Sequence, residues 1–251
     1  MKIIISPAKK MRSEVDGISA STRPVYTEKT KQLLTYLRTL PLAELKKLLA
    51  CNDALATLNY DRFQQMDLQS KGEPALWMYD GIQYQYMAVN VLDEEQIAYA
   101  QEHVRILSGF YGILRPLDGI VPYRLEMQAK LKSDFCKNLY DFWKDDLYKE
   151  ISKQETCIVD LASEEYSKCI SSYCKEPLQM IKIIFGEEQP DGSIKEKGVY
   201  AKMARGEMVR FMAENRIEDP SEIRSFDRLG YRFREELSSD TRYIFERVKA
   251  E

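Results

Sequence analysis

Two short apolar runs, each ended by a polar or ring-constrained residue, place the tightest limits on how this chain can fold. Lys2 to Ser6 is rich in isoleucine and stops at Pro7, which lacks the N–H that a further ladder bond requires. Thr156 to Ala162 is a second such run, and it leads into Ser163-Glu164-Glu165, a typical helix start. Runs that are apolar throughout are typical of strands buried on both faces. We therefore expect a buried sheet whose strands end in polar loops or helix starts.

Helices and further strands are predicted around these two runs. Apolar spacing of three and four residues indicates helices, with Thr27 as the first cap and Asp93 with Gln96 as a capping box. The aromatic stretch 72–91, which contains Asp80-Gly81, predicts a strand followed by a turn. The other expected elements are helices at 27–38, 41–50, 52–66, 93–104 and 140–153, strands at 178–185, 194–201, 230–237 and 241–248, and a hairpin turn at 190–192.

The order of these elements predicts the fold class. Strands and helices mix without a regular strand-helix-strand rhythm, and the chain has neither a GxGxxG loop nor a Walker A loop. No internal repeat and no long linker divides it. We expect a mixed α/β (α+β) protein that forms one compact domain over residues 1–251, with a mixed sheet flanked by helices.

Composition excludes several classes of site. The five cysteines are scattered without a CxxC pair, so neither a disulfide framework nor a zinc ribbon is indicated. His103 is the only histidine, which removes most zinc, haem and iron arrangements. We expect no metal site and no cofactor. The net charge of −3 means that any site for a polyanion must be local.

The apolar runs also indicate where in the cell the protein works. None approaches the roughly 18 residues that a membrane span requires, and the first apolar run is too short for a signal peptide. We expect a cytoplasmic protein that needs neither a membrane nor a stable protein partner.

The segment 105–126 holds an unusual density of glycine, proline and arginine. Gly109 and Gly112 allow backbone N–H groups to approach an anion closely, and Arg115 and Arg124 could bind phosphate oxygens. The other interpretation is a tight turn in which the glycines serve the backbone and the arginines pair with acids. Spacing alone favours neither.

Two further basic clusters and one acidic cluster are candidates. Lys9 and Lys10 lie in the loop that follows the first strand. The helix expected at 197–216 places Ala201, Ala204, Met208 and Phe211 on one face and basic residues on another. The candidate cations of this helix are Lys202, Arg205 and Arg210. Asp160, Glu164 and Glu165 could bind a divalent metal, but the helix dipole alone explains both glutamates.

The chain closely resembles the YaaA peroxide-stress protein family of bacteria. The matching residues occur in family order from near the first residue to near the last. They are Ile5-Ser-Pro-Ala-Lys9, Ile106 through Asp118, Pro122-Tyr-Arg-Leu-Glu-Met127, Asn138 through Trp143, Asp160 through Tyr166, Tyr200 through Gly206, Glu214-Asn-Arg216 and Phe226 through Tyr231.

The resemblance implies a cytosolic protein that helps cells to withstand hydrogen peroxide by protecting DNA and limiting free intracellular iron. It further implies a mixed α/β fold with a basic cleft that binds double-stranded or branched DNA. A helix-hairpin-helix-like element is implied beside the cleft, and by motif it maps onto Ser108 through Pro116.

Two hypotheses follow from the residues and the resemblance together. In the first, the three basic clusters form one cleft for sequence-independent DNA binding without catalysis. In the second, the protein is an enzyme acting on a nucleotide or nucleobase, with Glu126 or Asp160 as general acid or base and Tyr111 stacking or donating a proton. A continuous basic cleft joining Lys9, Arg115 and Lys202 would favour the first. A small closed pocket around Glu126 would favour the second.

Overall fold

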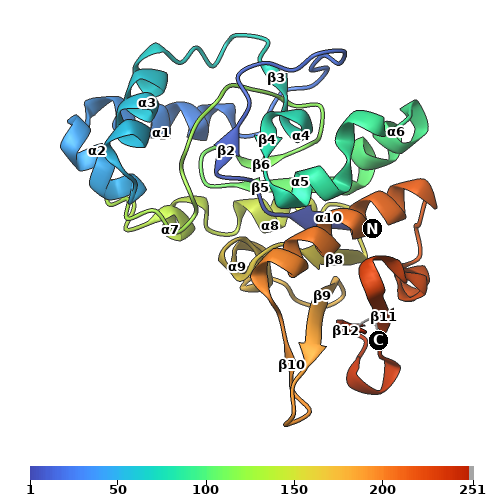
Figure 1. The fold of residues 1–251 in the computed structure, drawn as a ribbon. Coiled ribbons are helices and arrows are strands. Elements are labelled where there is room, and N and C mark those ends of the chain that lie inside the picture. The colour runs from blue at the N-terminus through green and yellow to red at the C-terminus, as the bar shows by residue number, and fades with distance from the viewer. Residues whose placement is uncertain (249–251) are drawn as a thin grey trace.

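The centre of the molecule is an eight-stranded sheet, seen in a computed structural model that describes residues 1–248 (Figure 1). Seven strands follow one another in the order β11, β12, β9, β8, β1, β5, β6, and β10 pairs with the far end of β9. The strands are β1 Lys2–Ile5, β5 Val104–Ser108, β6 Gly112–Leu114, β8 Cys157–Leu161, β9 Gln179–Glu188, β10 Ile194–Lys195, β11 Tyr231–Phe233 and β12 Arg242–Arg247.

The inner strands run parallel and are buried. Ile3 pairs with Val104 of β5 on one side and with Val159 of β8 on the other. All four residues of β1 and all five of β8 are buried, as expected for strands covered on both faces. The pairs β8 with β9 and β9 with β12 are also parallel, so the carboxyl ends of these strands meet at one edge of the sheet.

The chain changes direction across the sheet beside β1. It passes from β1 to β5 on one side, and later strands continue from β8 outward on the other side. In open α/β sheets, such a reversal leaves a crevice at the carboxyl ends of the adjoining strands, where ligands commonly bind.

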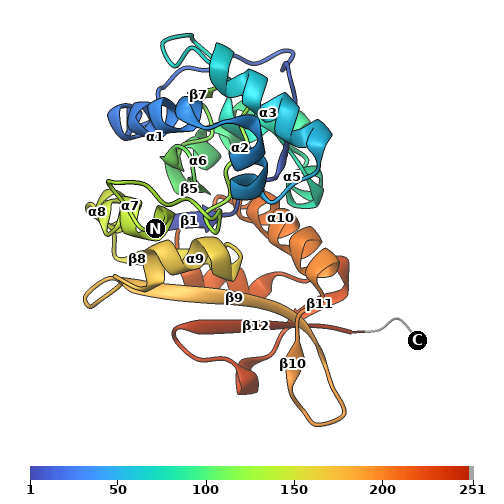
Figure 2. The same cartoon turned by 90° about the vertical axis from the view of Figure 1, so that its left-hand side faces the viewer.

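Helices cover the sheet and extend it at one end. In Figure 2, α1, α2 and α3 lie together at one end of the molecule, and the β9–β10 hairpin projects at the other. The helices are α1 Thr27–Thr39, α2 Leu42–Leu49, α3 Asp53–Gln65, α4 Ala75–Met78, α5 Ile82–Met87, α6 Glu94–His103, α7 Leu139–Trp143, α8 Asp146–Ile151, α9 Glu164–Ser171 and α10 Gly198–Glu214.

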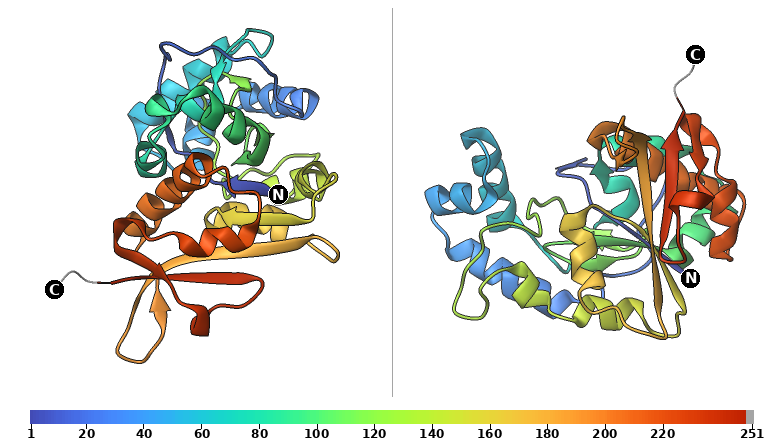
Figure 3. Two further views of the ribbon diagram at one scale, coloured as in Figure 1. Left: turned by 90° about the vertical axis from the view of Figure 1, so that its right-hand side faces the viewer. Right: turned by 90° about the horizontal axis from the view of Figure 1, so that it is seen from below.

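The longest helix, α10, lies between the N-terminal helices and the last strands. It packs against α5 and α6 and also against β9, and Figure 3 shows it in this position. Ala201, Ala204, Met208 and Phe211 are buried, which confirms the apolar face predicted from their spacing. No helix within residues 1–248 is both long and apolar enough to cross a membrane.

Short elements complete the fold. Two small two-stranded sheets stand beside the main one, and four 3-10 helices connect larger elements. The short strands are β2 Lys10–Met11 with β4 Tyr79–Asp80, and β3 Glu73–Pro74 with β7 Gly119–Ile120; the 3-10 helices are η1 Val89–Val91, η2 Pro220–Ser225, η3 Arg228–Gly230 and η4 Glu235–Leu237.

The structure confirms the predicted class, a mixed α/β domain with a largely parallel sheet flanked by helices. The capping box is present as predicted, with Asp93 accepting from the Gln96 amide and the Gln96 side chain accepting from Asp93. Thr27 is not a cap: it is the first helical residue of α1, and Tyr26 precedes it without a side-chain cap bond.

The prediction for residues 72–91 was wrong. In place of one strand and a turn, the stretch forms β3, α4, β4, α5 and η1. All of Ala75–Met78 is buried, so its aromatic and apolar composition reflects burial of a short helix on all sides. A run that is apolar on every face carries no period that separates a helix from a strand.

Two other boundaries differ from the predictions. The helix expected at 140–153 is divided into α7 and α8 because Lys144 has a left-handed φ of 47°, which a continuous helix does not allow. The return strand expected at 194–201 has only two residues, because α10 begins at Gly198.

The helix-hairpin-helix-like element expected at Ser108 through Pro116 is not found there. The segment is a β-hairpin, in which Ser108 at the end of β5 pairs with Gly112 at the start of β6. It belongs to the central sheet and lies among buried residues.

Candidate functional site: a pocket at the carboxyl ends of β1 and β8

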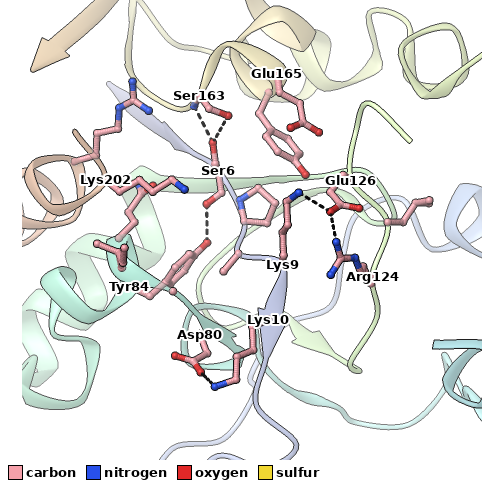
Figure 4. Close-up of a pocket in the computed structure, with 18 of the residues that line it drawn as sticks. Ser6, Lys9, Lys10, Asp80, Tyr84, Arg124, Glu126, Ser163, Glu165 and Lys202 are labelled. Atoms are coloured by element: carbon pink, nitrogen blue, oxygen red, sulfur yellow. Dashed lines mark hydrogen bonds and ion pairs between the residues drawn. The ribbon is translucent and has the colours of Figure 1, made fainter. Parts of the chain in front are cut away.

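A pocket of about 560 Å³ opens where β1 and β8 end, at the point where the chain reverses across the sheet (Figure 4). Its size falls within the roughly 300–1,000 Å³ typical of small-molecule sites. The polar and charged residues that line it are Ser6, Lys9, Lys10, Asp80, Gln83, Tyr84, Tyr123, Arg124, Glu126, Ser163, Glu165, Tyr166, Lys202 and Arg205.

Two serines join the strand ends at the centre of the pocket. The backbone N–H of Ser163 donates to the Ser6 hydroxyl at 2.8 Å, and the two hydroxyl oxygens lie 3.1 Å apart. The Tyr84 hydroxyl donates to the Ser6 carbonyl at 2.9 Å. Ser6, the residue after β1, thus bonds to α5 and to the start of α9.

One side of the pocket carries a carboxylate held by two cations. Glu126 Oε1 forms an ion pair with Lys9 Nζ and accepts a hydrogen bond from Arg124 Nη2, each at 3.0 Å. The Glu126 and Arg124 side chains are mostly buried, whereas the Lys9 side chain is 69% exposed. Lys9 therefore reaches over Glu126 from the solvent. Glu165 lies on the same side and accepts from the Gln128 amide at 3.0 Å. We call Glu126 and Glu165 the carboxylate wall.

A second ion pair stands at the rim. Lys10 Nζ lies 2.5 Å from Asp80 Oδ2, where β2 and β4 pair. The hydrogen bond from Lys10 lowers the pKa of the Asp80 carboxyl below its ordinary value, against the opposing effect of burial.

The opposite side is formed by α10 and α5. A Cβ on Gly206 would lie 2.0 Å from the Gln83 carbonyl oxygen, so only glycine allows the two helices to approach this closely. The approach brings Lys202 and Arg205 of α10 to the pocket beside Gln83. We call these three residues the cationic wall.

Several nitrogen donors around the pocket lack acceptors. Within residues 1–248, no ion pair or hydrogen bond involves the Lys202 side chain, which is exposed. Four buried side-chain atoms in the same range lack a hydrogen-bond partner, and three of them belong to pocket residues: Gln83 Nε2, Arg124 Nε and Arg205 Nε. An unpaired buried donor costs about 1–3 kcal/mol, so these three nitrogens are unfavourable for stability.

The structure brings six of the predicted site residues together here. Lys9, Lys10, Arg124, Glu126, Lys202 and Arg205 all line the pocket, although they come from distant parts of the sequence. The strand-end loop and the basic helix thus contribute to one pocket.

The residues at the tip of the 105–126 segment lie elsewhere, in the interior. Ser108 is fully buried, and its hydroxyl accepts from the amides of Phe110 and Tyr111. A Cβ on Gly109 would lie 2.4 Å from the Leu125 carbonyl oxygen, and Gly112 has a φ of +79° against the Trp143 ring. These glycines serve the close packing of a turn, which was the other interpretation drawn from the sequence.

Three more candidates are bound within the protein. Arg115 pairs with the buried Asp118 at 3.3 Å, and Arg210 pairs with Glu214 at 2.7 Å. Tyr111 is buried, and its hydroxyl accepts from the Val121 amide. None of the three lines the pocket.

Asp160 lies behind the pocket and not in it. It is buried in β8, where it accepts from Ser167 and from the Ala162 amide. Burial raises the pKa of this carboxyl above its ordinary value, although both hydrogen bonds oppose the effect. Within residues 1–248, no three His, Cys, Asp or Glu side chains are grouped so that they could hold a metal ion.

Sequence comparison adds the family to this geometry. A family model described as peroxide stress protein YaaA matches residues 1–237. The chain belongs to this family. Membership of the YaaA family supports a role in the response to oxidative stress.

Relatives of this YaaA-family chain match it along its whole length. A UPF0246 protein of Desulfitobacterium hafniense (strain Y51) is 56% identical over 251 residues, which is 100% of both chains. A UPF0246 protein of Pediococcus pentosaceus is 52% identical over 245 residues, or 98% of this chain and 97% of the relative. One of Agathobacter rectalis is 51% identical over 247 residues, or 98% and 99%.

Sequence reasoning missed several polar residues of this YaaA-family pocket, namely Ser6, Asp80, Gln83, Tyr84 and Ser163. Ser6 is the last residue of the first predicted strand and Ser163 directly follows the second, so the rule that sites lie at strand ends could have found them. Glu165 was considered only as a metal ligand. No local signal distinguishes Gln83, because its role depends on how closely α10 approaches α5.

Proposed function

We propose that this protein acts in the response to oxidative stress by binding the phosphates of double-stranded or branched DNA at the pocket, without reading the base sequence. The observation that carries the proposal is the convergence of Lys9, Lys10, Arg124, Lys202 and Arg205 on one pocket in a chain whose net charge is −3. Basic side chains outnumber the acidic ones there.

The exposure of the lysines supports contact with a polymer. Lys9 and Lys10 are 69% and 79% exposed, and Lys202 is exposed on the other side of the opening. Lysine ammonium groups bind phosphate as point charges and carry no base specificity. Arg115 is not part of this surface, so the basic region is smaller than a cleft joining all three sequence clusters.

Under this proposal, the protein works in the cytosol, covers DNA during peroxide stress and limits free iron. The family resemblance supports the last two roles. The pocket supports the contact with DNA.

A salt titration tests the proposal. Phosphate-dominated binding predicts that log K falls linearly with log salt, with a slope of about −0.9 per neutralised phosphate. Fluorescence anisotropy with duplexes of unrelated sequence should give equal affinities. Lys9→Ala and Lys202→Ala should weaken all of them alike, while Lys47→Ala on the distant α2 should not. Binding without a salt slope, or unaffected by both pocket variants, would refute the proposal.

The size of the pocket favours a second candidate function, an enzyme that acts on a nucleotide or nucleobase. Glu126 is mostly buried, lies inside a pocket of small-molecule size and has two cations on one oxygen. A carboxylate in this position could act as a general acid or base. Purified protein should then turn over one member of a panel of nucleotides and modified bases, and Glu126→Gln should abolish turnover while DNA binding persists.

A further inference from the structure

The pocket has two chemically opposite walls that face each other across its centre. Figure 4 shows Lys202 on one side of Ser6 and both Glu126 and Glu165 on the other. Binding of a uniform polyanion needs only cations. A pair of opposed walls is typical of a site that orients one small molecule with different groups at its two ends.

The cationic wall presents donors that need acceptors. Lys202 has no partner within residues 1–248, and Gln83 is 7% exposed with its Nε2 unpaired. Arg205 donates from Nη2 to Glu196 Oε1 at 3.1 Å, and its Nε has no hydrogen-bond partner. Three donor-bearing side chains at one end of a pocket match the oxygens of a single phosphate group.

The carboxylate wall presents acceptors. Lys9 and Arg124 both bond to Glu126 Oε1, and the Gln128 amide bonds to Glu165 Oε1. Within the described chain, no hydrogen bond is made to the second carboxylate oxygen of either residue. This wall therefore suits a group that donates hydrogen bonds and repels one that only accepts them.

The space between the walls is mostly apolar. Ala8, Ile82 and Leu125 line it together with Tyr123 and Tyr166. Burial raises the pKa of Tyr123 to about 12, so its hydroxyl stays neutral and adds no charge. A flat ring system fits such a lining.

From these walls we infer that the pocket binds a free nucleoside monophosphate with an amino-substituted base. The phosphate lies at the cationic wall, and the exocyclic amino group donates to the carboxylate wall. The inference concerns the same pocket as the proposed DNA binding and rests on that assignment of the site. It adds a monomeric ligand with a fixed orientation.

Calorimetry on the full chain with three ligands tests each wall. AMP should bind more tightly than adenosine, which lacks the phosphate, and more tightly than IMP, which presents an oxygen where AMP presents an amino group. A charge-assisted hydrogen bond contributes about 1.5–3 kcal/mol. Loss of the phosphate in adenosine, or of the amino group in IMP, should therefore weaken binding by about tenfold or more. Equal affinities for AMP and IMP would overturn the assignment of the carboxylate wall and with it the inference.

Variants then assign each preference to its wall. Lys202→Ala should weaken AMP and leave adenosine unchanged, with Lys47→Ala as the matched control. Glu165→Gln should bring the AMP to IMP ratio towards one, because an amide both donates and accepts. An AMP affinity unchanged by Lys202→Ala would contradict the inference. The wild-type ligand series needs no variant, so it decides the matter even if a variant fails to fold.

DNA binding measured on the same preparations separates the two claims. AMP binding without DNA binding would support the monophosphate site and refute the proposed function. DNA binding without AMP binding would do the reverse.

Discussion

The β5–β6 hairpin and the pocket both contain buried polar groups, but only in the hairpin are these groups satisfied within the protein. In the hairpin, the polar groups find partners: the Ser108 hydroxyl lies 2.6 Å from the Tyr123 hydroxyl, and Trp143 Nε1 donates to the Gly109 carbonyl at 3.0 Å. In the pocket, Lys202 is without a partner among the described residues, and three buried nitrogens are unpaired. The difference teaches that a dense polar motif can be structural, and that unpaired donors mark the site.

If this comparison is right, the largest loss of stability should come from removing a side chain that packs against the hairpin, Trp143 of α7. Trp143→Ala removes a fully buried ring that packs against Gly112, and it leaves the Gly109 carbonyl without its donor. We expect the free energy of unfolding to fall by about 3–5 kcal/mol, measured by urea denaturation. A loss below about 1 kcal/mol would mean that the hairpin is not held as described.

Ser108→Ala should have a smaller effect on the same region. It leaves the amides of Phe110 and Tyr111 and the Tyr123 hydroxyl without one partner each. The expected loss is about 1–3 kcal/mol, with ligand affinity at the pocket retained in the fraction that stays folded. A variant that keeps full stability but loses ligand binding would show that Ser108 acts in binding and not in stability.

The ion pair at the pocket rim should contribute less. The Asp80 pKa is lowered in the folded state, so its contribution is present above the ordinary value of 3.8 and is lost as the pH falls through the lower folded value. Because Lys10 is exposed, the contribution should be below about 1 kcal/mol. A carbon-detected NMR titration should place the Asp80 pKa below 3.8 in the wild type and closer to it in Lys10→Ala.

Lys202→Ala should change stability least. The side chain is exposed and has no partner within residues 1–248, so the unfolding free energy should stay within about 0.5 kcal/mol. Binding at the pocket should nevertheless weaken. A destabilised Lys202→Ala variant would show that the residue is structural, and the contrast between the two regions would fail.

The parts of the fold with strong local signals were predictable. β1 and β8 follow from apolar runs with sharp ends, and α6 follows from a capping box. Residues 72–91 were not predictable in this way, because a segment buried on all sides has no polar face to reveal its period. The break at Lys144 depends on a single left-handed residue, which composition does not mark.

The candidate site was predicted in part. The exposed cations Lys9, Lys10 and Lys202 were found because they form local clusters. Arg115 and Arg210 belong to equally basic segments, but each pairs with an acid only three or four residues further along the chain, Asp118 or Glu214. Local spacing thus already indicates which of these cations are neutralised, whereas the fold decides which of the others meet at one pocket.

The pocket is lined by residues that are spread over most of the chain, among them Ser6, Asp80, Glu126, Ser163 and Lys202. Contacts between residues so far apart form late in folding, because each closes a long loop. A partly synthesised or partly folded chain therefore holds the individual side chains without a binding site. Ligand binding should appear only when α10 has docked on α5, so recovery of affinity during refolding reports the completion of the whole domain.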